Sequence, residues 1–87
     1  MPQRKLSSGE RLRATRLALG LSLRDVQGAS LKLAKQLRDR RFTLPASRLH
    51  EFEVKDWVPR VHRLYTLAHV YGCDLKELLG WYGIPLA

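Results

Sequence analysis

The chain has 87 residues, a formal net charge of +8 and a hydrophobic content of 45%. This length allows one domain (1–87) with one modest core, and the apolar content is too high for a disordered chain. No apolar run is long enough to cross a membrane, so we expect a cytoplasmic protein without a membrane partner. The single cysteine, Cys73, excludes an internal disulfide.

The positive charge is concentrated in the first half of the chain. Residues 1–48 contain 12 Lys and Arg against 3 Asp and Glu, a net charge of +9. Residues 49–87 contain 4 Lys and Arg against 5 Asp and Glu, a net charge of −1. A segregated basic face is typical of a protein that binds a polyanion, although a solvated basic surface has the same composition.

The first helix is predicted to follow residues 1–6, which form a basic arm that we expect to be flexible. Ser7 and Glu10 have the three-residue spacing of a capping box, so the helix begins there. Its inward-facing apolar stripe is expected at Leu12, Leu17, Leu19 and Leu21.

A tight corner joins this helix to the next. Gly20 stands where a helix ends with a left-handed residue, and Ser22 follows as the N-cap of a second helix, with Asp25 three residues later. The two helices are therefore expected to cross at a steep angle. The exposed amides of the second helix and Arg24 form an arrangement that can bind a phosphate.

The second helix is predicted to be long for so small a domain. Apolar or small residues recur at three- and four-residue steps from Leu23 to Leu37, which predicts a helix to about Arg38. Gly28 in its middle weakens it by about 1 kcal/mol relative to alanine. A basic loop with one apolar anchor, Phe42, is expected to follow.

Three further helices complete the expected fold. The third begins at Pro45 and covers about 45–53, followed by a linker at 54–58. The fourth is opened by Pro59 and ended by Gly72, and Asp74 caps the fifth. No segment alternates with the period of a half-buried strand, so the prediction is an all-α domain of five helices. The apolar tail 81–87 either packs back on the domain or leads into a further C-terminal region.

Four segments, in this order, resemble a known family. They are LRATRLALGLSLRDV (12–26), LHEFE (49–53) ahead of Pro59, LYTLA (64–68) and DLKELL (74–79). Together they resemble the Cro/repressor-type (XRE) helix-turn-helix domain over roughly residues 9–79. The resemblance implies a lambda-repressor-like fold and sequence-specific binding of double-stranded DNA by a bacterial transcriptional regulator. The helix at 45–53 would be its recognition helix in the major groove.

The chain differs from the family at the turn between the second and third helices. About eleven residues separate the matching apolar positions in ordinary members, whereas Val26 and Leu49 lie 23 positions apart here. The additional residues fall at 28–42, so the chain resembles a variant subgroup with an expanded turn. The family therefore does not predict the orientation of the third helix in this chain.

The resemblance also implies which residues form the site. Arg16 matches an arginine that pairs with a glutamate at the end of the recognition helix, here Glu53, and this pair would join the first and third helices. Base contacts are expected from Ala46, Ser47, Arg48, His50 and Glu51. The fork of Arg48 matches guanine O6 and N7. Glu51 can accept from cytosine N4 or pair within the protein with Arg48 or Lys55.

Contacts to the DNA backbone are expected from the second helix and the basic loop. The candidates are Ser22, Leu23, Arg24, Lys32, Lys35, Arg38, Arg40 and Arg41. Leu23 occupies a position where the family often has a polar side chain, so only its backbone amide is available to a phosphate. The alternative for the lysines and arginines is a solvated helix face.

The alternative function is a protein–protein interaction module that retains the fold without reading bases. The expanded turn, Leu23, Glu51 and the apolar tail favour it. We expect no enzyme activity, cofactor, small-molecule ligand or metal, since no glycine-rich phosphate loop or metal-ligand spacing is present and His62 and His69 lie seven positions apart. A single module of this size binds DNA weakly, so a homodimer or an additional domain is expected.

Overall fold

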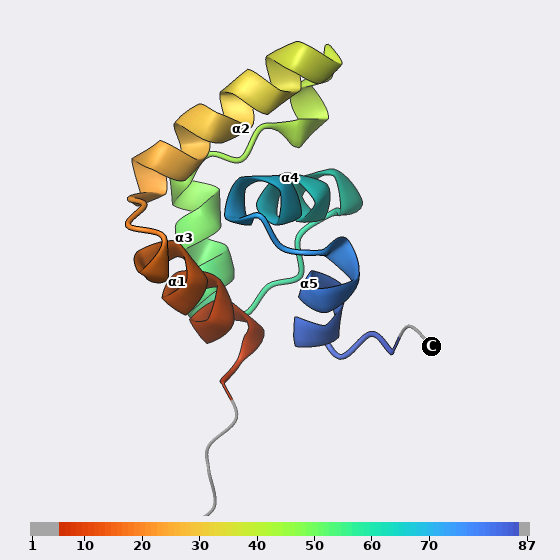
Figure 1. Ribbon diagram of the computed structural model, residues 1–87. Coiled ribbons are helices and arrows are strands. Elements are labelled where there is room, and N and C mark those ends of the chain that lie inside the picture. Colours follow the sequence, from red (N-terminus) through yellow and green to blue (C-terminus); the bar gives the residue numbers. More distant parts are fainter. Residues whose placement is uncertain (1–5, 86–87) are drawn as a thin grey trace, which may run out of the picture.

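The computed structural model describes residues 6–85, which form five α-helices and one short 3-10 helix (Figure 1). The elements are α1 (Ser8–Ala18), α2 (Leu23–Leu37), η1 (Arg40–Phe42), α3 (Ala46–Lys55), α4 (Val61–Tyr71) and α5 (Leu75–Trp81). No strand occurs among these described residues. The prediction of an all-α domain with five helices is confirmed.

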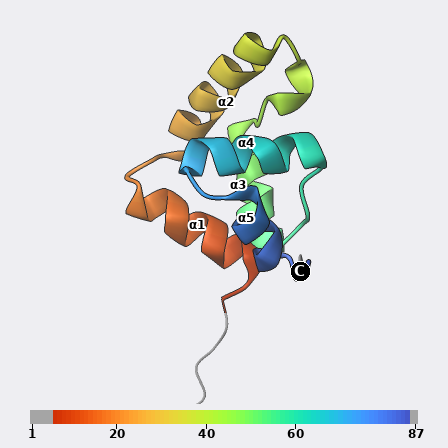
Figure 2. The same cartoon turned by 45° about the vertical axis from the view of Figure 1, so that its right-hand side comes forward.

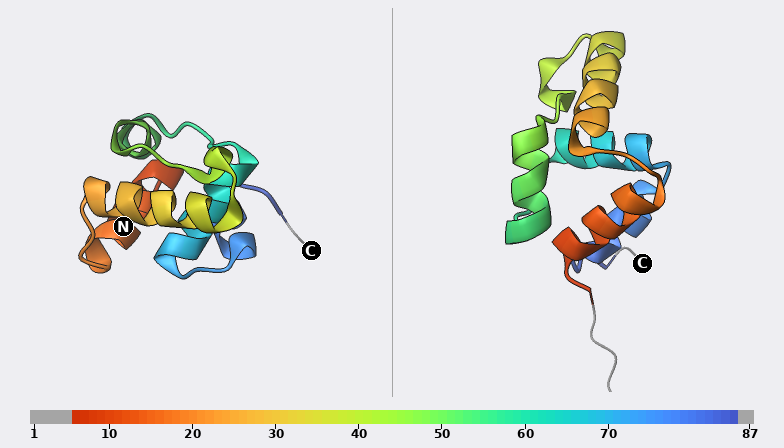
Figure 3. Two further views of the ribbon diagram at one scale, coloured as in Figure 1. Left: turned by 90° about the horizontal axis from the view of Figure 1, so that it is seen from above. Right: turned by 90° about the vertical axis from the view of Figure 1, so that its left-hand side faces the viewer.

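The helices surround one core. α2 lies at one end of the molecule, α4 crosses the middle, and α1 and α5 lie at the other end (Figures 1 and 3). α3 runs along one side and packs against both α1 and α2. All five helices and the segment before α3 contribute fully buried side chains, including Leu12, Val26, Leu44, Leu49, Leu67 and Leu78.

The first two helices begin and join as their sequences predict. In α1, the Ser7 hydroxyl accepts from the Glu10 amide at 3.2 Å, and the Ser7 amide donates to the Glu10 carboxylate at 3.1 Å. Ser22 and Asp25 make the same reciprocal bonds at the start of α2, at 3.0 and 2.8 Å. Gly20 has a φ of 70°, and α1 and α2 meet there at a steep angle (Figure 2).

The predicted apolar stripe of α1 is wrong at two positions. Leu17 is 53% exposed and Leu19 is 48% exposed. α1 ends at Ala18, so Leu19 is already the C-cap. The inward position one turn after Leu12 belongs to Arg16, which is buried.

Several predicted boundaries differ by one or two residues. α2 passes unbroken through Gly28 and ends at Leu37, with Arg38 as a left-handed C-cap. Pro45 is the N-cap of α3 and not its first helical residue. α3 continues to Lys55 and α4 begins at Val61, with Arg60 as its N-cap, so the linker covers residues 56–60 and Pro59 lies in it.

The two ends of the chain are described in part. Residues 1–5 of the expected arm and 86–87 of the expected tail lie outside the described residues. Trp81 and Tyr82, at the start of that tail, pack against the core. Within residues 6–85, no helix has the length and apolar character needed to cross a membrane.

Candidate nucleic-acid interface

The candidate recognition helix α3 is held against α1 by a buried ion pair. Arg16 Nε lies 2.7 Å from Glu53 Oε2, and Arg16 Nη2 donates to Glu53 Oε1 at 2.9 Å. Arg16 Nη1 donates to the Leu21 carbonyl at 3.0 Å, so the same guanidinium also fixes the corner before α2. The hydrogen bonds that Arg16 donates to Glu53 raise the pKa of Arg16. The structure thus brings together the two residues that the resemblance pairs, and their role is to position α3.

The expanded turn is a folded hairpin in which η1 returns along α2 (Figure 1). Its last part, residues 42–46, is the connecting segment that leads into α3. Two side chains of α2 hold this segment. The buried Ser30 hydroxyl accepts from the Leu44 amide at 2.9 Å, and the Gln27 carbonyl accepts from the Ala46 amide at 2.7 Å. Because Ala46 is the first residue of α3, Gln27 takes the place of an N-cap side chain.

Side chains of α4 hold the connecting segment from its other side. Thr66 Oγ1 donates to the Phe42 carbonyl at 2.6 Å, and Arg63 Nε donates to the Thr43 carbonyl at 3.1 Å. The Phe42 ring packs edge-on against His62 and Tyr65, with centroid distances of 5.0 and 5.5 Å. The orientation of α3, which the family resemblance does not predict, is therefore fixed by bonds to α2 and α4.

The predicted base-contacting residues occupy different environments on α3. Ser47, Arg48 and His50 are exposed, whereas Ala46 and Glu51 are half-buried. Glu51 Oε1 lies 3.6 Å from Arg48 Nη1, and Glu51 Oε2 lies 3.7 Å from Lys55 Nζ. Glu51 therefore makes the pairs within the protein that were one of its two alternatives.

The start of α2 is a less open phosphate site than the sequence predicts. The Asp25 carboxylate accepts from the Ser22 amide, and these bonds lower the pKa of Asp25. A carboxylate at this position already compensates the positive end of the helix dipole. The Leu23 side chain is half-buried against the core, so the exposed Arg24 is the cation that this corner offers to a phosphate.

The other predicted phosphate contacts lie along α2 and at the tip of the hairpin. Lys32, Lys35, Arg38, Arg40 and Arg41 are all exposed. Lys35 stands about three helical turns after Arg24 and therefore on the same side of α2, opposite the buried Val26 and Leu33. Arg41 differs from the rest because it forms a close ion pair with Asp39, with Nη2 and Oδ2 2.7 Å apart.

This ion pair predicts a pH dependence at the hairpin tip. The side-chain and then the backbone hydrogen bonds from Arg41 lower the pKa of Asp39 to about 2. A lowered pKa means that the stabilisation by ionised Asp39 is complete above its unfolded pKa, about 3.9, and is lost as the pH falls through about 2. We expect a carboxyl NMR titration to place the Asp39 midpoint near 2. Arg41→Gln should raise this midpoint and Arg40→Gln should leave it unchanged; equal effects would contradict the assignment.

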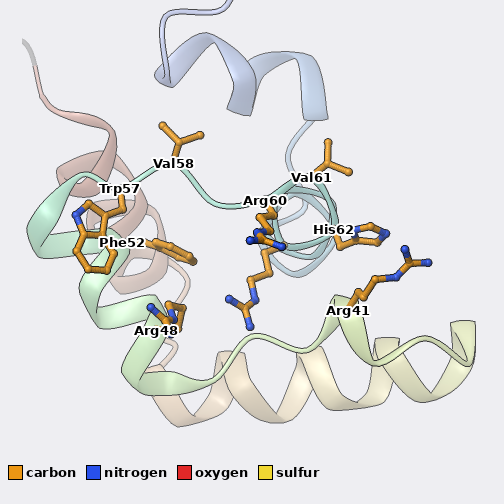
Figure 4. Close-up of a pocket in the computed structure, with 9 residues that line it drawn as sticks. Arg41, Arg48, Phe52, Trp57, Val58, Arg60, Val61 and His62 are labelled. Atoms are coloured by element: carbon orange, nitrogen blue, oxygen red, sulfur yellow. The ribbon is translucent and has the colours of Figure 1, made fainter.

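A basic groove lies between α3, η1 and the start of α4 (Figure 4). It has a volume of about 1090 Å³ and is lined by four arginines: Arg41, Arg48, Arg60 and Arg63. The rest of its lining is Phe52, Trp57, Val58, Val61 and His62. Burial, and then the charges of Arg48 and Arg60, lower the pKa of Arg63. The groove thus concentrates positive charge and contains no carboxylate in its lining.

The sequence prediction missed Arg60 and Arg63 as members of a site. Their signal is the basic stretch after Pro59, but only the fold brings it next to Arg48. Gln27, Ser30 and Thr66, which hold the connecting segment, were also missed. Each is a polar residue on a helix, a pattern that gives no sign of its partner.

Comparisons with known proteins do not assign the chain to a family. No family model matches it, and no match was found among curated proteins or solved structures. Within the part of the chain that the structure describes, no group of three His, Cys, Asp or Glu side chains is placed to hold a metal ion.

Proposed function

We propose that the chain is the DNA-binding domain of a bacterial transcriptional regulator and recognises double-stranded DNA by inserting α3 into the major groove. The observation that carries this proposal is the presentation of α3. Its start is fixed by Gln27, its end is fixed by the Arg16–Glu53 pair, and Ser47, Arg48 and His50 are exposed on it. A rigid helix with an exposed arginine near its N-terminus is suited to contact base edges.

Arg48 is the main base-reading residue in this proposal. Its guanidinium is exposed and lies 3.6 Å from Glu51, an i,i+3 carboxylate that restricts where the guanidinium can go. On DNA the fork donates two bonds to guanine O6 and N7. Ser47 and His50 add weaker contacts on either side of it, and Ala46 packs against a thymine methyl group.

The cations of α2 and the hairpin tip contact phosphates in this proposal. Arg24 holds one strand at the corner, and the basic stripe of α2 extends the contact beyond the usual footprint. The residues are Arg24, Lys32, Lys35, Arg38 and Arg40. These contacts contribute affinity without base preference and make binding strongly dependent on salt. Because one such module binds weakly, we expect two copies on a palindromic site or a second domain.

Selection of bound sequences from random duplex DNA, followed by affinity measurements over a range of salt concentrations, tests this proposal. Arg48→Ala should cost about 1–3 kcal/mol on the selected site and relax the preference at one base pair. Lys35→Ala should weaken binding to all sequences and reduce the salt slope by about 1. Arg13→Ala, an exposed arginine on α1, serves as the control and should change neither. Absence of duplex binding even at low salt would contradict the proposal.

One observation favours the alternative of a protein–protein interaction module. Glu51 lies near Arg48 and Lys55 on α3, and a carboxylate there repels DNA phosphates. If the module binds proteins only, the double substitution of Ser47 and Arg48 by alanine should leave any DNA affinity and base preference unchanged.

A further inference from the structure

The groove between α3 and α4 has an apolar side that DNA binding does not use. Trp57 is 44% exposed, Val58 is 64% exposed and Val61 is 70% exposed. All three belong to the lining of the groove, where Trp57 lies near Phe52 and the side chains of Val58 and Val61 point away from Arg48 (Figure 4). The DNA backbone can pair with the arginines but offers little apolar surface to Trp57, Val58 and Val61. Phosphate contacts therefore explain the arginines of the lining and leave its apolar residues unexplained. Adjacent exposed apolar residues of this kind mark a surface that binds a partner.

Two of the four arginines in the groove have a carboxylate partner, since Arg41 pairs with Asp39 and Arg48 lies near Glu51. Within residues 6–85, no ion pair joins Arg60 or Arg63 to a carboxylate. Arg63 donates to a neutral partner, the Thr43 carbonyl, and burial and then the nearby charges of Arg48 and Arg60 lower its pKa. These guanidiniums repel each other in the free protein, so an anionic occupant gains from all of them together.

The shape and the order of the lining indicate an extended occupant. Trp57, Phe52 and Arg48 lie at one end of the groove, Arg60 in the middle, and His62 and Arg41 at the other end (Figure 4). A mononucleotide would place its single base and its phosphates over a small part of this length. A peptide with acidic and apolar side chains can place carboxylates on the arginines and an apolar side chain over Trp57.

We propose that this groove is a docking site for an extended acidic peptide segment with apolar side chains, contributed by a partner protein. Its carboxylates pair with Arg48, Arg60 and Arg63, and its apolar side chains cover Trp57, Val58 and Val61. Docking differs from DNA binding in its need for apolar contact. A peptide bound in the groove pairs with Arg48, so the partner protein and DNA compete for that side chain.

Two synthetic peptides of equal length and charge test the docking site. In one, glutamate alternates with leucine; in the other, glutamate alternates with serine. Calorimetric titration of the full chain should show the Glu/Leu peptide binding at least about tenfold more tightly, because only it buries apolar surface in the groove. Amide NMR shifts should fall on Val58, Arg60 and Val61. Equal affinity of the two peptides would overturn the proposal, because the binding would then be non-specific charge attraction.

Matched variants locate the binding and separate it from DNA recognition. Val61→Ser should remove most of the preference for the Glu/Leu peptide, whereas Leu31→Ser on α2 should retain it; Leu31 is also exposed, at 50%. Arg60→Glu should weaken both peptides by at least about tenfold. A loss of duplex DNA affinity by Val61→Ser as large as its loss of peptide affinity would overturn the proposal and assign the groove to DNA. Failure of the chain to bind any duplex, with the peptide preference intact, would contradict only the proposed function.

Discussion

Replacing Glu53 with alanine is expected to destabilise the domain by about 3–5 kcal/mol, which is a large part of the stability of a small domain. The substitution leaves the buried guanidinium of Arg16 without its counter-charge. That guanidinium makes two bonds to Glu53, at 2.7 and 2.9 Å, and Glu53 itself is only 6% exposed. Urea unfolding followed by circular dichroism measures the change. A lower midpoint with an unchanged slope would show a loss of stability without a change in compactness.

Glu51→Ala is the matched control for this substitution. It removes a carboxylate from the same helix, but that carboxylate is half-exposed and lies 3.6 and 3.7 Å from its two partners. An exposed pair of this kind contributes about 0–1 kcal/mol. If Glu51→Ala and Glu53→Ala had equal effects, the stabilisation would depend on helix propensity or net charge and not on the buried pair.

Gly9→Ala is expected to destabilise the domain by about 1–3 kcal/mol or more, although alanine favours helix over glycine. Gly9 lies in the first turn of α1, against the end of α3. An added Cβ would overlap the Glu53 carbonyl oxygen and the Asp56 carboxylate. The same contact includes a bond from the Gly9 amide to Asp56 Oδ1 at 2.8 Å. The overlap is with backbone, so α1 must move away from α3.

Gly28→Ala provides a control of opposite sign. Gly28 lies in the middle of α2, and a Cβ there would meet no heavy atom within 4 Å. This substitution should stabilise the domain by about 0.5–1 kcal/mol, the ordinary gain in a helix interior. Thermal unfolding of the two variants measures both effects. Equal stabilisation by the two substitutions would contradict the close packing of α1 on α3.

The sequence predicts those parts of the fold that depend on local signals. Ser7 with Glu10, and Ser22 with Asp25, mark two helix starts because a capping box needs only residues three positions apart. Gly20 marks the corner because it takes a positive φ that other residues avoid. The regular spacing in α2 predicts an unbroken helix through Gly28. These features require no knowledge of distant residues.

Features that depend on distant residues were predicted poorly or not at all. Leu17 and Leu19 are apolar like core residues, but α1 ends at Ala18 and about half of each residue is exposed. The basic groove requires Arg60 to approach Arg48, and only the path of the chain between α3 and α4 brings them together. The Arg16–Glu53 pair, 37 positions apart, was expected only through the family resemblance.

The hairpin has two parts that differ in how firmly they are held. The connecting segment is bound by side chains of α2 and α4, and the tip lies outside these bonds. Side chains from α2 and α4 hold the backbone at Phe42, Thr43, Leu44 and Ala46. The tip, residues 35–41, makes none of these bonds, so they fix the orientation of α3 without it. Changes in the length or charge of the tip should therefore leave α3 in place. Under the proposed function, a tip that varies in this way changes how many DNA phosphates the domain contacts without changing which bases α3 contacts.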